Sequence, residues 1–321
     1  MMLGVSAEQE ELRASVRRFL ADRAPLSRVR ELMEGGETDW AVWEQAGSQL
    51  GLQGLAIPEA YGGAGFSFAE QAIVLEEFGA ALYGGPYLAS AVLAATALLA
   101  SPDEGARREL LPPIASGRTV ATLAFTEDGG SWDPGAIRLS AVKDGAAWRL
   151  DGHKSFVLDG GTARLVGELG EGAAIMDRTL DIAAIALAAE QLGGAQRALD
   201  MAVEYAKIRH QFGRPIGSFQ AIKHRCADLL LEVESLRAAV TYAAAAVAED
   251  SPEVPVLASL VKALGSEVYF HVAAENIQIH GGIGFTWEHD AHLFFKRAKA
   301  SELFLGDVAY HRERLATRIG M

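Results

Sequence analysis

Arg209-His-Gln-Phe-Gly-Arg-Pro-Ile-Gly-Ser-Phe-Gln220 is the stretch around which the rest of the chain is organised. The spacing of apolar residues predicts one long helix before it, over 181–207, and another after it, over 221–248. Gly213 allows turn dihedrals that other residues disfavour, and Pro215 cannot continue the incoming helix. The sequence therefore predicts a helical hairpin whose tight connector, residues 209–220, carries cations and aromatic rings.

The connector has residue types that can bind a phosphorylated ligand with a flat ring. Arg209 and Arg214 can each meet a phosphate with forked N–H donors. Phe212 and Phe219 offer flat apolar faces. The simpler interpretation is a loop with two basic residues and two core aromatics, and the loop alone does not decide between the two.

Composition excludes several classes of protein. The 321 residues suffice for one large or two to three small domains with a sizeable core. The net charge of −13 argues against nucleic acid or an anionic membrane as a partner. No uninterrupted run of about 18 apolar residues occurs, so no transmembrane helix is expected, and the first ten residues lack the pattern of a signal peptide. The single cysteine, Cys226, excludes an internal disulfide and fits a reducing cytoplasm.

The first part of the chain, residues 1–118, predicts an all-helical domain. Ser6 and Gln9 form a capping box ahead of the first apolar stripe, and Pro25 is expected to end that helix. The glycine-rich stretch at 50–65 is not a Rossmann fingerprint, because its spacing is wrong and no strand-then-helix pattern frames it. Further helices are expected over 40–50, 67–79, 87–99 and 104–115.

The pattern changes at Thr119, where a short middle β domain over 119–172 is predicted. Its β-leaning segments are separated by turns such as Asp144-Gly145. Four or five strands are too few for a self-sufficient barrel, so the sheet must lean on helices. The strands are expected over 119–125, 137–142, 147–150 and 154–158.

The rest of the chain, residues 173–321, predicts an antiparallel four-helix bundle, so the fold is mostly α. The glycine turn, Gln278-Ile-His-Gly-Gly-Ile-Gly-Phe285, separates the last two helices and lets a phosphate or another backbone approach closely. By itself such a turn marks only a change of direction. The bundle helices are expected over 173–207, 218–249, 253–280 and 289–318.

Metal and hydrolase sites are not predicted. His280, His289 and His292 could be interpreted as a metal cluster, but no Glu-x-x-His or His-Glu-x-x-His motif accompanies them. Ser131 has no nucleophile-elbow setting, so no hydrolase triad is expected.

Three landmarks in this order and spacing resemble the acyl-CoA dehydrogenase family: Thr-Glu at 126–127, Arg-His-Gln-Phe-Gly at 209–213, and the glycine turn at 278–285. Residues 50–65 are similar to a glycine-rich segment of that family, so the resemblance covers nearly the whole chain. It implies a flavoprotein that binds FAD and an acyl-CoA thioester, passes electrons to an electron-transfer flavoprotein or a similar acceptor, and works in the cytoplasm as a homo- or hetero-oligomer. In this family a glutamate removes the α-proton while the β-hydrogen passes as hydride to the flavin.

The resemblance also implies which residues bind FAD. Arg209 and Phe212 match residues that hold the pyrophosphate and adenine side across a subunit interface. Gln278, Gly281 and Gly282 match the contact made by the partner subunit.

Three further residues complete the expected cofactor site. Thr126 matches the β-domain residue that meets the flavin ring, and Phe156 stands where the family often has a tryptophan packed on that ring. Gln220 closes the connector. Leu158 stands where the family often supplies a threonine to the flavin, and the family's β domain is longer, so part of the expected wall is absent.

The catalytic base of the family is missing from this chain. The family's glutamate position is Leu305, within Phe304-Leu-Gly-Asp307, and the alternative position falls on Ala183. Loss of a general base costs about 10²–10⁴ in rate. Glu190 and Asp307 lie near these positions and could substitute, so no catalytic residue is assigned.

Two functions remain open. The first is an FAD-linked acyl-CoA dehydrogenase subunit whose partner supplies the glutamate, similar to the heteromeric branch that acts on steroid side-chain CoA thioesters. The second is a non-catalytic structural or ligand-binding protein on the same scaffold, which the short sheet and the absent base favour.

Overall fold

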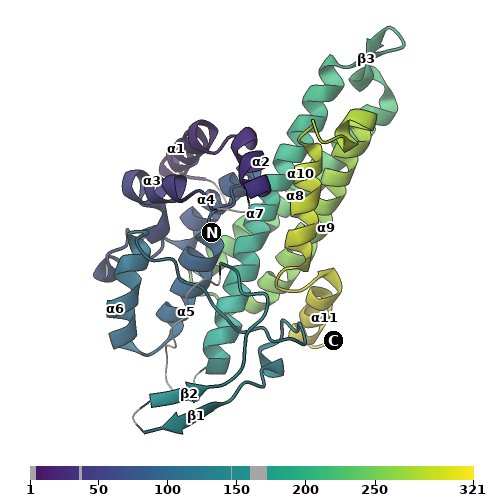
Figure 1. Ribbon diagram of the computed structural model, residues 1–321. Helices are drawn as coiled ribbons and strands as arrows, with labels where there is room; N and C mark the ends of the chain where they lie inside the picture. The colour runs from purple at the N-terminus through teal and green to yellow at the C-terminus, as the bar shows by residue number, and fades with distance from the viewer. Residues whose placement is uncertain (1–4, 36–37, 146, 160–171) are drawn as a thin grey trace. The chain divides into compact units, whose positions relative to one another are not determined.

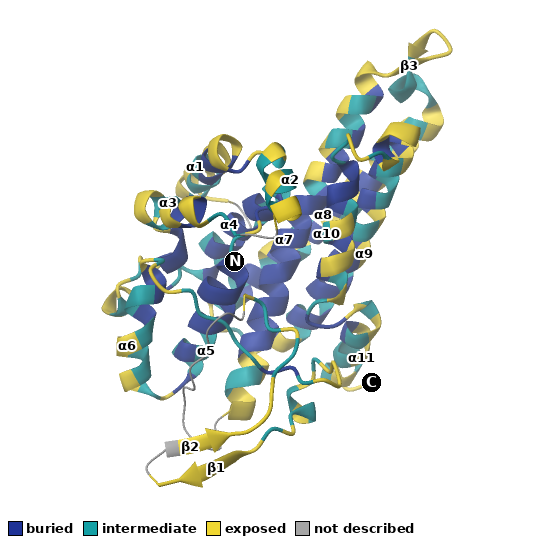
Figure 2. Ribbon diagram, viewed as in Figure 1, coloured by how far each residue is buried: buried dark blue, intermediate teal, exposed yellow. Residues whose placement is uncertain are grey.

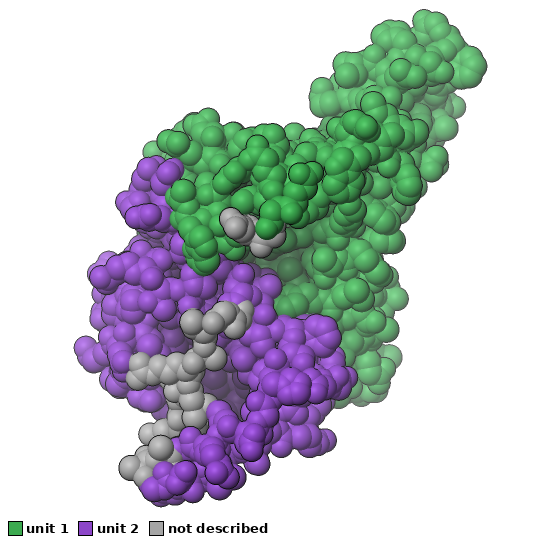
Figure 3. Space-filling view, viewed as in Figure 1, with its two compact units in different colours: residues 1–42, 66–85, 184–321 green, residues 43–65, 86–183 purple. Residues whose placement is uncertain are grey.

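The structure, a computed structural model, describes residues 5–35, 38–145, 147–159 and 172–321 (Figure 1). These residues form eleven α-helices and four short strands, which confirms the mostly α class. The chain divides into two compact units, coloured separately in Figure 3. Unit 1 comprises residues 1–42, 66–85 and 184–321, and unit 2 comprises residues 43–65 and 86–183. The three-domain division stays a prediction.

The first helix, α1 (Ala7–Arg23), begins with the expected capping box. The Ser6 hydroxyl accepts the Gln9 N–H at 3.2 Å, and the Gln9 side chain accepts the Ser6 N–H at 3.0 Å. These two bonds satisfy N–H groups that a helix start leaves without partners. Helix α1 packs against α4 (Phe68–Ala81), and Arg17 bonds Glu77 between them at 2.8 Å.

A helix that the sequence analysis missed follows directly. Pro25 ends α1, but its carbonyl then accepts the N–H groups of Arg28 and Val29, at 2.8 and 3.2 Å, and starts α2 (Leu26–Gly35). Proline is tolerated at a helix start because the N–H it lacks would have no partner there. Helix α3 (Trp40–Leu50) follows as predicted.

The long helices form the bundle that the sequence predicted. They are α7 (Gly172–Ile208), α8 (Gln220–Ala248) and α9 (Val254–His280), and α9 packs against α8, α10 and α11. The single helix expected over 289–318 is wrong, because it is two helices, α10 (Ala291–Leu303) and α11 (Val308–Arg318). Leu305 has a left-handed backbone, with φ of 61°, and Asp307 caps α11, so the chain turns there.

The segment Val254–Phe285 is long and apolar enough, by length and composition, to cross a membrane. It is the one such candidate among the described residues. Of its apolar window, 61% is buried inside the protein, and Figure 2 shows the inner faces of the bundle helices buried. This burial is typical of the core helix of a bundle.

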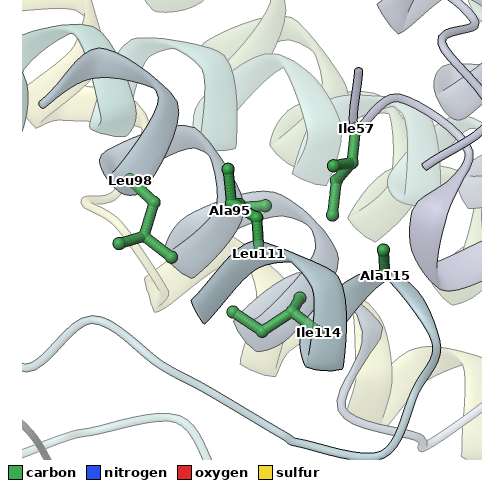
Figure 4. Close-up of a cluster of buried hydrophobic side chains, with 6 residues drawn as sticks. All are labelled: Ile57, Ala95, Leu98, Leu111, Ile114 and Ala115. Atoms are coloured by element: carbon green, nitrogen blue, oxygen red, sulfur yellow. The ribbon is translucent and has the colours of Figure 1, made fainter. Parts of the chain in front are cut away.

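Unit 2 has its own small core. Two single-turn 3₁₀ helices, η1 (Leu52–Gly54) and η2 (Glu59–Tyr61), are followed by a π-helical turn, η3 (Leu88–Ala94), that continues into α5 (Ala95–Ala100). Helix α6 (Glu104–Ala115) has the predicted bounds. Figure 4 shows the cluster these segments bury: Ile57, Ala95, Leu98, Leu111, Ile114 and Ala115.

A small sheet forms in the described chain, but only two of the four predicted strands belong to it: the strand over 147–150 has the predicted bounds, and the one over 137–142 is shifted to begin at Ala141. In the described part of unit 2 only β1 (Ala141–Asp144) and β2 (Ala147–Leu150) form a ladder, antiparallel, with Val142 opposite Arg149. The segments expected as strands over 119–125 and 154–158 run beside each other with isolated bonds, such as the Thr122 hydroxyl to the Leu158 carbonyl at 2.6 Å. They have β-leaning composition but no continuous partner among the residues that the structure describes, and β1 is exposed throughout.

Candidate functional site

The connector folds as a short two-stranded turn at the end of the α7–α8 hairpin, near the label β3 in Figure 1. Strand β3 (His210–Gln211) pairs with β4 (Arg214–Pro215), and the single-turn helix η5 (Ile216–Ser218) leads into α8. Phe212 and Gly213 both have positive φ, 53° and 77°, which is the geometry of a tight hairpin turn. The predicted helical hairpin with a tight connector is therefore confirmed.

The connector presents its functional groups to solvent. Phe212 is 92% exposed, so it is not the core aromatic of the simpler interpretation. The guanidinium of Arg214 lies 4.0 Å over the ring of Phe219, whose edge meets Phe212 at 6.1 Å between ring centres. Arg209 is exposed, and its guanidinium has no hydrogen-bond or ion-pair partner among the residues the structure describes.

The connector and the glycine turn lie at the same end of unit 1. The ring of Tyr205, one helical turn before Arg209, stacks on His280 with centres 4.2 Å apart. Ile216, from the connector, packs on a buried cluster that includes Ile279. The structure thus brings together two motifs separated by about seventy positions in the sequence. We call this region the cofactor end, because the sequence resemblance predicts that both motifs bind FAD.

The glycine turn leaves open space at the cofactor end. Gly281 has φ of 65°, and a β-carbon built on Gly281 or Gly282 would meet no atom within 4 Å. Gln278 and Gln220 are exposed on the helix ends beside it. A flat or phosphorylated ligand could therefore lie directly against this backbone.

Two of the expected site residues belong to unit 2. Thr126 is buried, and its carbonyl accepts the Ser155 N–H, which places Thr126 beside Phe156. Phe156 is 67% exposed in a left-handed backbone conformation with φ of 54°, and its ring centre lies 6.4 Å from that of Trp132. These residues offer an open aromatic face next to a buried threonine.

Comparison with known proteins decides the family. Residues 6–118 match the acyl-CoA dehydrogenase N-terminal domain, and residues 170–320 match the C-terminal domain. Acyl-CoA dehydrogenase IpdE2 of Mycobacterium tuberculosis is 41% identical over 305 residues, which cover 93% of each chain. The chain belongs to the acyl-CoA dehydrogenase family.

Solved structures agree with this assignment. The steroid ACAD Tcur3481-Tcur3483 has a TM-score of 0.87 and 30% identity, with 98% of each chain covered. A chain of the ChsE4-ChsE5 complex from Mycobacterium tuberculosis has a TM-score of 0.87 and 27% identity, with 99% of each chain covered. The protein is therefore an oxidoreductase of the class acting on CH–CH bonds, and FAD is the cofactor of this class.

The cofactor end fits the adenine and pyrophosphate side of FAD. A cation without an anion, an exposed phenyl ring and a backbone turn with open space are what a dinucleotide needs from a protein surface. Arg209, Phe212 and Gly281 provide these three features within unit 1.

Neither residue that could replace the catalytic glutamate is free. Glu190 is buried, and it accepts a hydrogen bond from Arg297 Nε at 2.8 Å and a second from Arg297 Nη2. This carboxylate raises the pKa of the Arg297 guanidinium. Asp307 accepts the Tyr310 N–H at 2.9 Å as the cap of α11. Leu305 and Ala183, where the sequence resemblance predicts the family's base, are both buried apolar residues.

A buried lysine behind the Leu305 turn was not predicted. Lys262 is completely buried, and its ammonium donates to Ser266 Oγ at 2.9 Å, the Gly306 carbonyl at 3.0 Å and the Glu302 carbonyl at 3.1 Å. Burial lowers the pKa of Lys262 to about 8. A lysine on an otherwise apolar helix face was the sequence signal that could have revealed it.

A second buried base holds the same turn. His311 Nε2 contacts the Leu305 carbonyl at 2.9 Å, and because a carbonyl only accepts, the proton is on Nε2. Burial, followed by repulsion from Lys262, lowers the pKa of His311 to about 3. The turn at Leu305 and Gly306 is therefore held by Lys262 and His311.

The histidines near the glycine turn are engaged with one another and with aromatic rings. His280 and His289 have ring centres 4.2 Å apart, and His292 stacks on Trp287 at 4.9 Å. Across the part of the chain that the structure describes, no three His, Cys, Asp or Glu side chains are placed to hold a metal ion.

Proposed function

We propose that this chain is a subunit of an FAD-dependent acyl-CoA dehydrogenase that oxidises the Cα–Cβ bond of a steroid side-chain CoA thioester. The family assignment supports the reaction. The likeness to a structure described as a steroid ACAD, at 30% identity over nearly the full length, supports the steroid substrate class. Electrons then pass to an electron-transfer flavoprotein or a similar acceptor, and the reaction takes place in the cytoplasm.

The cofactor end holds the dinucleotide part of FAD in this proposal. Arg209 bonds the pyrophosphate with forked N–H donors, and Phe212 lies against the adenine. Gly281 and Gly282 let a phosphate reach the backbone, while Gln278 and Gln220 supply amide groups at the rim.

In this proposal the flavin ring is contacted by residues of unit 2, and the cofactor end of another subunit holds the adenine side of the same FAD. Thr126 offers its hydroxyl and backbone to the ring, and Phe156 covers one face of the ring as an apolar surface. When bound, FAD accepts the β-hydrogen as hydride. The residues of this chain orient the cofactor. No proton-removing role is given to Glu190 or Asp307, because the first is bonded to Arg297 and the second caps α11.

We propose that a partner chain supplies the catalytic glutamate. The observation that carries this proposal is the contrast between an open cofactor end and an absent base, with Glu190 and Asp307 already engaged elsewhere. The likeness to a chain of the ChsE4-ChsE5 complex supports a heteromeric assembly.

The first experiment is a visible absorption spectrum of the purified chain, alone and after incubation with FAD. Bound flavin is expected to give a yellow protein with the flavin absorbance bands. A protein that stays colourless in both preparations, and also when co-purified with a second acyl-CoA dehydrogenase chain, would favour the alternative of a non-catalytic ligand-binding protein on this scaffold.

The second experiment follows dye reduction by an acyl-CoA, with this chain alone and with a co-expressed acyl-CoA dehydrogenase chain that retains its glutamate. Turnover is expected only in the mixture, and it should be lost when the glutamate of the added chain is changed to glutamine. Turnover by this chain alone would show that no partner is needed.

A further inference from the structure

Unit 1 contains a cavity of about 360 Å³ that the proposed reaction does not use. Its walls come from α2, from the turn after α4 at 82–85 and from α10. The volume is within the range of about 300–1,000 Å³ that is usual for small-molecule sites. None of the cofactor-site residues named above lines this cavity.

The walls of the cavity are mainly apolar. Val29 and Leu32 face it from α2, Leu293 faces it from α10, and Leu82 closes it from the turn after α4. Met33 also lines it and remains exposed to solvent, so the cavity has an open edge with an adaptable side chain. A hydrocarbon chain could be buried against these walls.

The cations around the cavity are not all neutralised by the protein. Arg28 pairs with Asp39 at 2.7 Å and Glu31 at 2.8 Å, and Arg297 pairs with Glu190. Lys296 has no carboxylate partner among the described residues, and its ammonium lies 4.4 Å over the ring of Trp287. Lys296 lines the cavity and is exposed to solvent, so its ammonium is available to pair with a ligand anion.

Two more polar groups at the cavity have unused hydrogen-bonding capacity. The hydroxyl of Tyr83 is buried and makes no hydrogen bond within the described chain, and burial raises the pKa of Tyr83, so the hydroxyl remains a donor. Gly85 makes room for that ring, because a β-carbon on Gly85 would lie 2.3 Å from the Tyr83 oxygen. The Arg297 side chain is 37% exposed although its Nε and Nη2 are bonded to Glu190.

We propose that this cavity binds a free amphipathic carboxylic acid, with its hydrocarbon body against α2 and its carboxylate at Lys296. An uncharged hydrocarbon would leave the lysine without a counter-ion, and an amine would be repelled by it. The proposal does not depend on the flavin chemistry, because the cavity is built by residues outside the cofactor end.

Binding is tested by calorimetric titration of the full-length chain with dodecanoate below its micelle concentration. 1-Dodecanol and dodecylamine, of the same chain length, separate the contribution of the carboxylate from that of the hydrocarbon. Saturable binding of one dodecanoate per chain is expected, with weaker binding of the alcohol and none of the amine. Equal binding of all three, or no saturable binding of dodecanoate, would overturn the proposal.

Three variants locate the site. Lys296→Gln is expected to weaken dodecanoate binding by about two- to fivefold, the effect of losing one exposed ion pair. Ala300→Trp, at an exposed position that lines the cavity, should block it. Lys299→Gln is the matched control on the same helix, because Lys299 pairs with Glu302 and does not line the cavity. Unchanged affinity in both Lys296→Gln and Ala300→Trp would place the ligand elsewhere.

A further measurement separates this cavity from the acyl-CoA site. Dye reduction by the assembled enzyme should be the same for Ala300→Trp and for the unchanged chain. A loss of turnover in a folded Ala300→Trp protein would show that the cavity belongs to the substrate site, which contradicts the proposal. If neither the unchanged enzyme nor any variant shows turnover, only the proposed function is contradicted. The dodecanoate titration still tests the cavity, because it needs neither flavin nor activity.

Discussion

Arg209 is an exposed cation without an anionic partner in the described chain, and its side chain gives the most direct test of the cofactor end. Arg209→Gln is expected to weaken FAD binding by about 10- to 100-fold, because a hydrogen bond to a charged group contributes about 1.5–3 kcal/mol. Flavin retained after gel filtration measures this. Lys207→Gln, on the same helix end and paired with Glu204, is the control. Equal flavin retention in both variants would contradict the assignment.

Lys262 makes stability depend on pH in the alkaline range. Its folded-state pKa of about 8 lies below the unfolded value of 10.5. Between these values the unfolded chain holds a proton that the folded chain has released, so the free energy of unfolding rises with pH, by about 3 kcal/mol in total. Urea unfolding at pH 8 and 10.5 measures the rise. The rise in the free energy of unfolding should be smaller in Lys262→Met and unchanged in Lys299→Met. Equal rises in the unchanged chain and in both variants would refute the role of Lys262.

His311 has the corresponding effect in acid. Its pKa is about 3 when folded and 6.5 when unfolded, so the unfolded chain takes up a proton first as pH falls. Stability from this residue is lost between pH 6.5 and about 3, by up to about 4–5 kcal/mol. His311→Gln, which can still donate to the Leu305 carbonyl, should unfold less steeply with acid. His224→Gln, an exposed histidine on α8, should match the unchanged chain, and a His311→Gln protein with the same acid profile would disprove the idea.

At the scale of elements, the contact between α4 and α7 depends on a glycine. A β-carbon on Gly193 would lie 1.8 Å from the carbonyl oxygen of Glu76, so the two helix backbones touch there. Gly193→Ala is expected to lower the free energy of unfolding by at least about 1–3 kcal/mol, because the helices must move apart. Gly35→Ala, where a β-carbon meets nothing within 4 Å, is the control. Thermal and urea unfolding compare them; equal stability would mean that the helices can shift freely.

The bounds of helices and turns could be predicted where a few neighbouring residues determine them by themselves. The capping box at Ser6 and the glycine and proline of the connector act over a few residues, and these elements were confirmed. Helix α2 was missed because Pro25 was interpreted only as an end and not also as a start. The strands over 119–125 and 154–158 were wrong because a strand needs a partner, which its own residues do not specify.

At the scale of the whole molecule, the cofactor end exposes several large apolar side chains to solvent. Ile208, Phe212 and Phe285 are all exposed there. We infer that this surface contacts another chain, because exposed apolar patches are typical of protein–protein interfaces. Sedimentation velocity is expected to show a homo- or hetero-oligomer, and Phe212→Asp together with Phe285→Asp should shift it toward the monomer. Leu231→Asp, at an exposed position on α8, is the control for a general effect of added charge and should leave the oligomer intact. If the unchanged chain with bound FAD is a monomer, the predicted oligomer is contradicted.

The sequence determined the helical class, the hairpin around 209–220 and the family, because each depends on residue identity at fixed positions. Tertiary structure alone decided that Glu190 and Asp307 are already engaged, that Lys262 and His311 hold the Leu305 turn, and that a cavity lies between α2 and α10. These features join residues far apart in the chain. Their energies come from burial and from partners that exist only once the helices have packed.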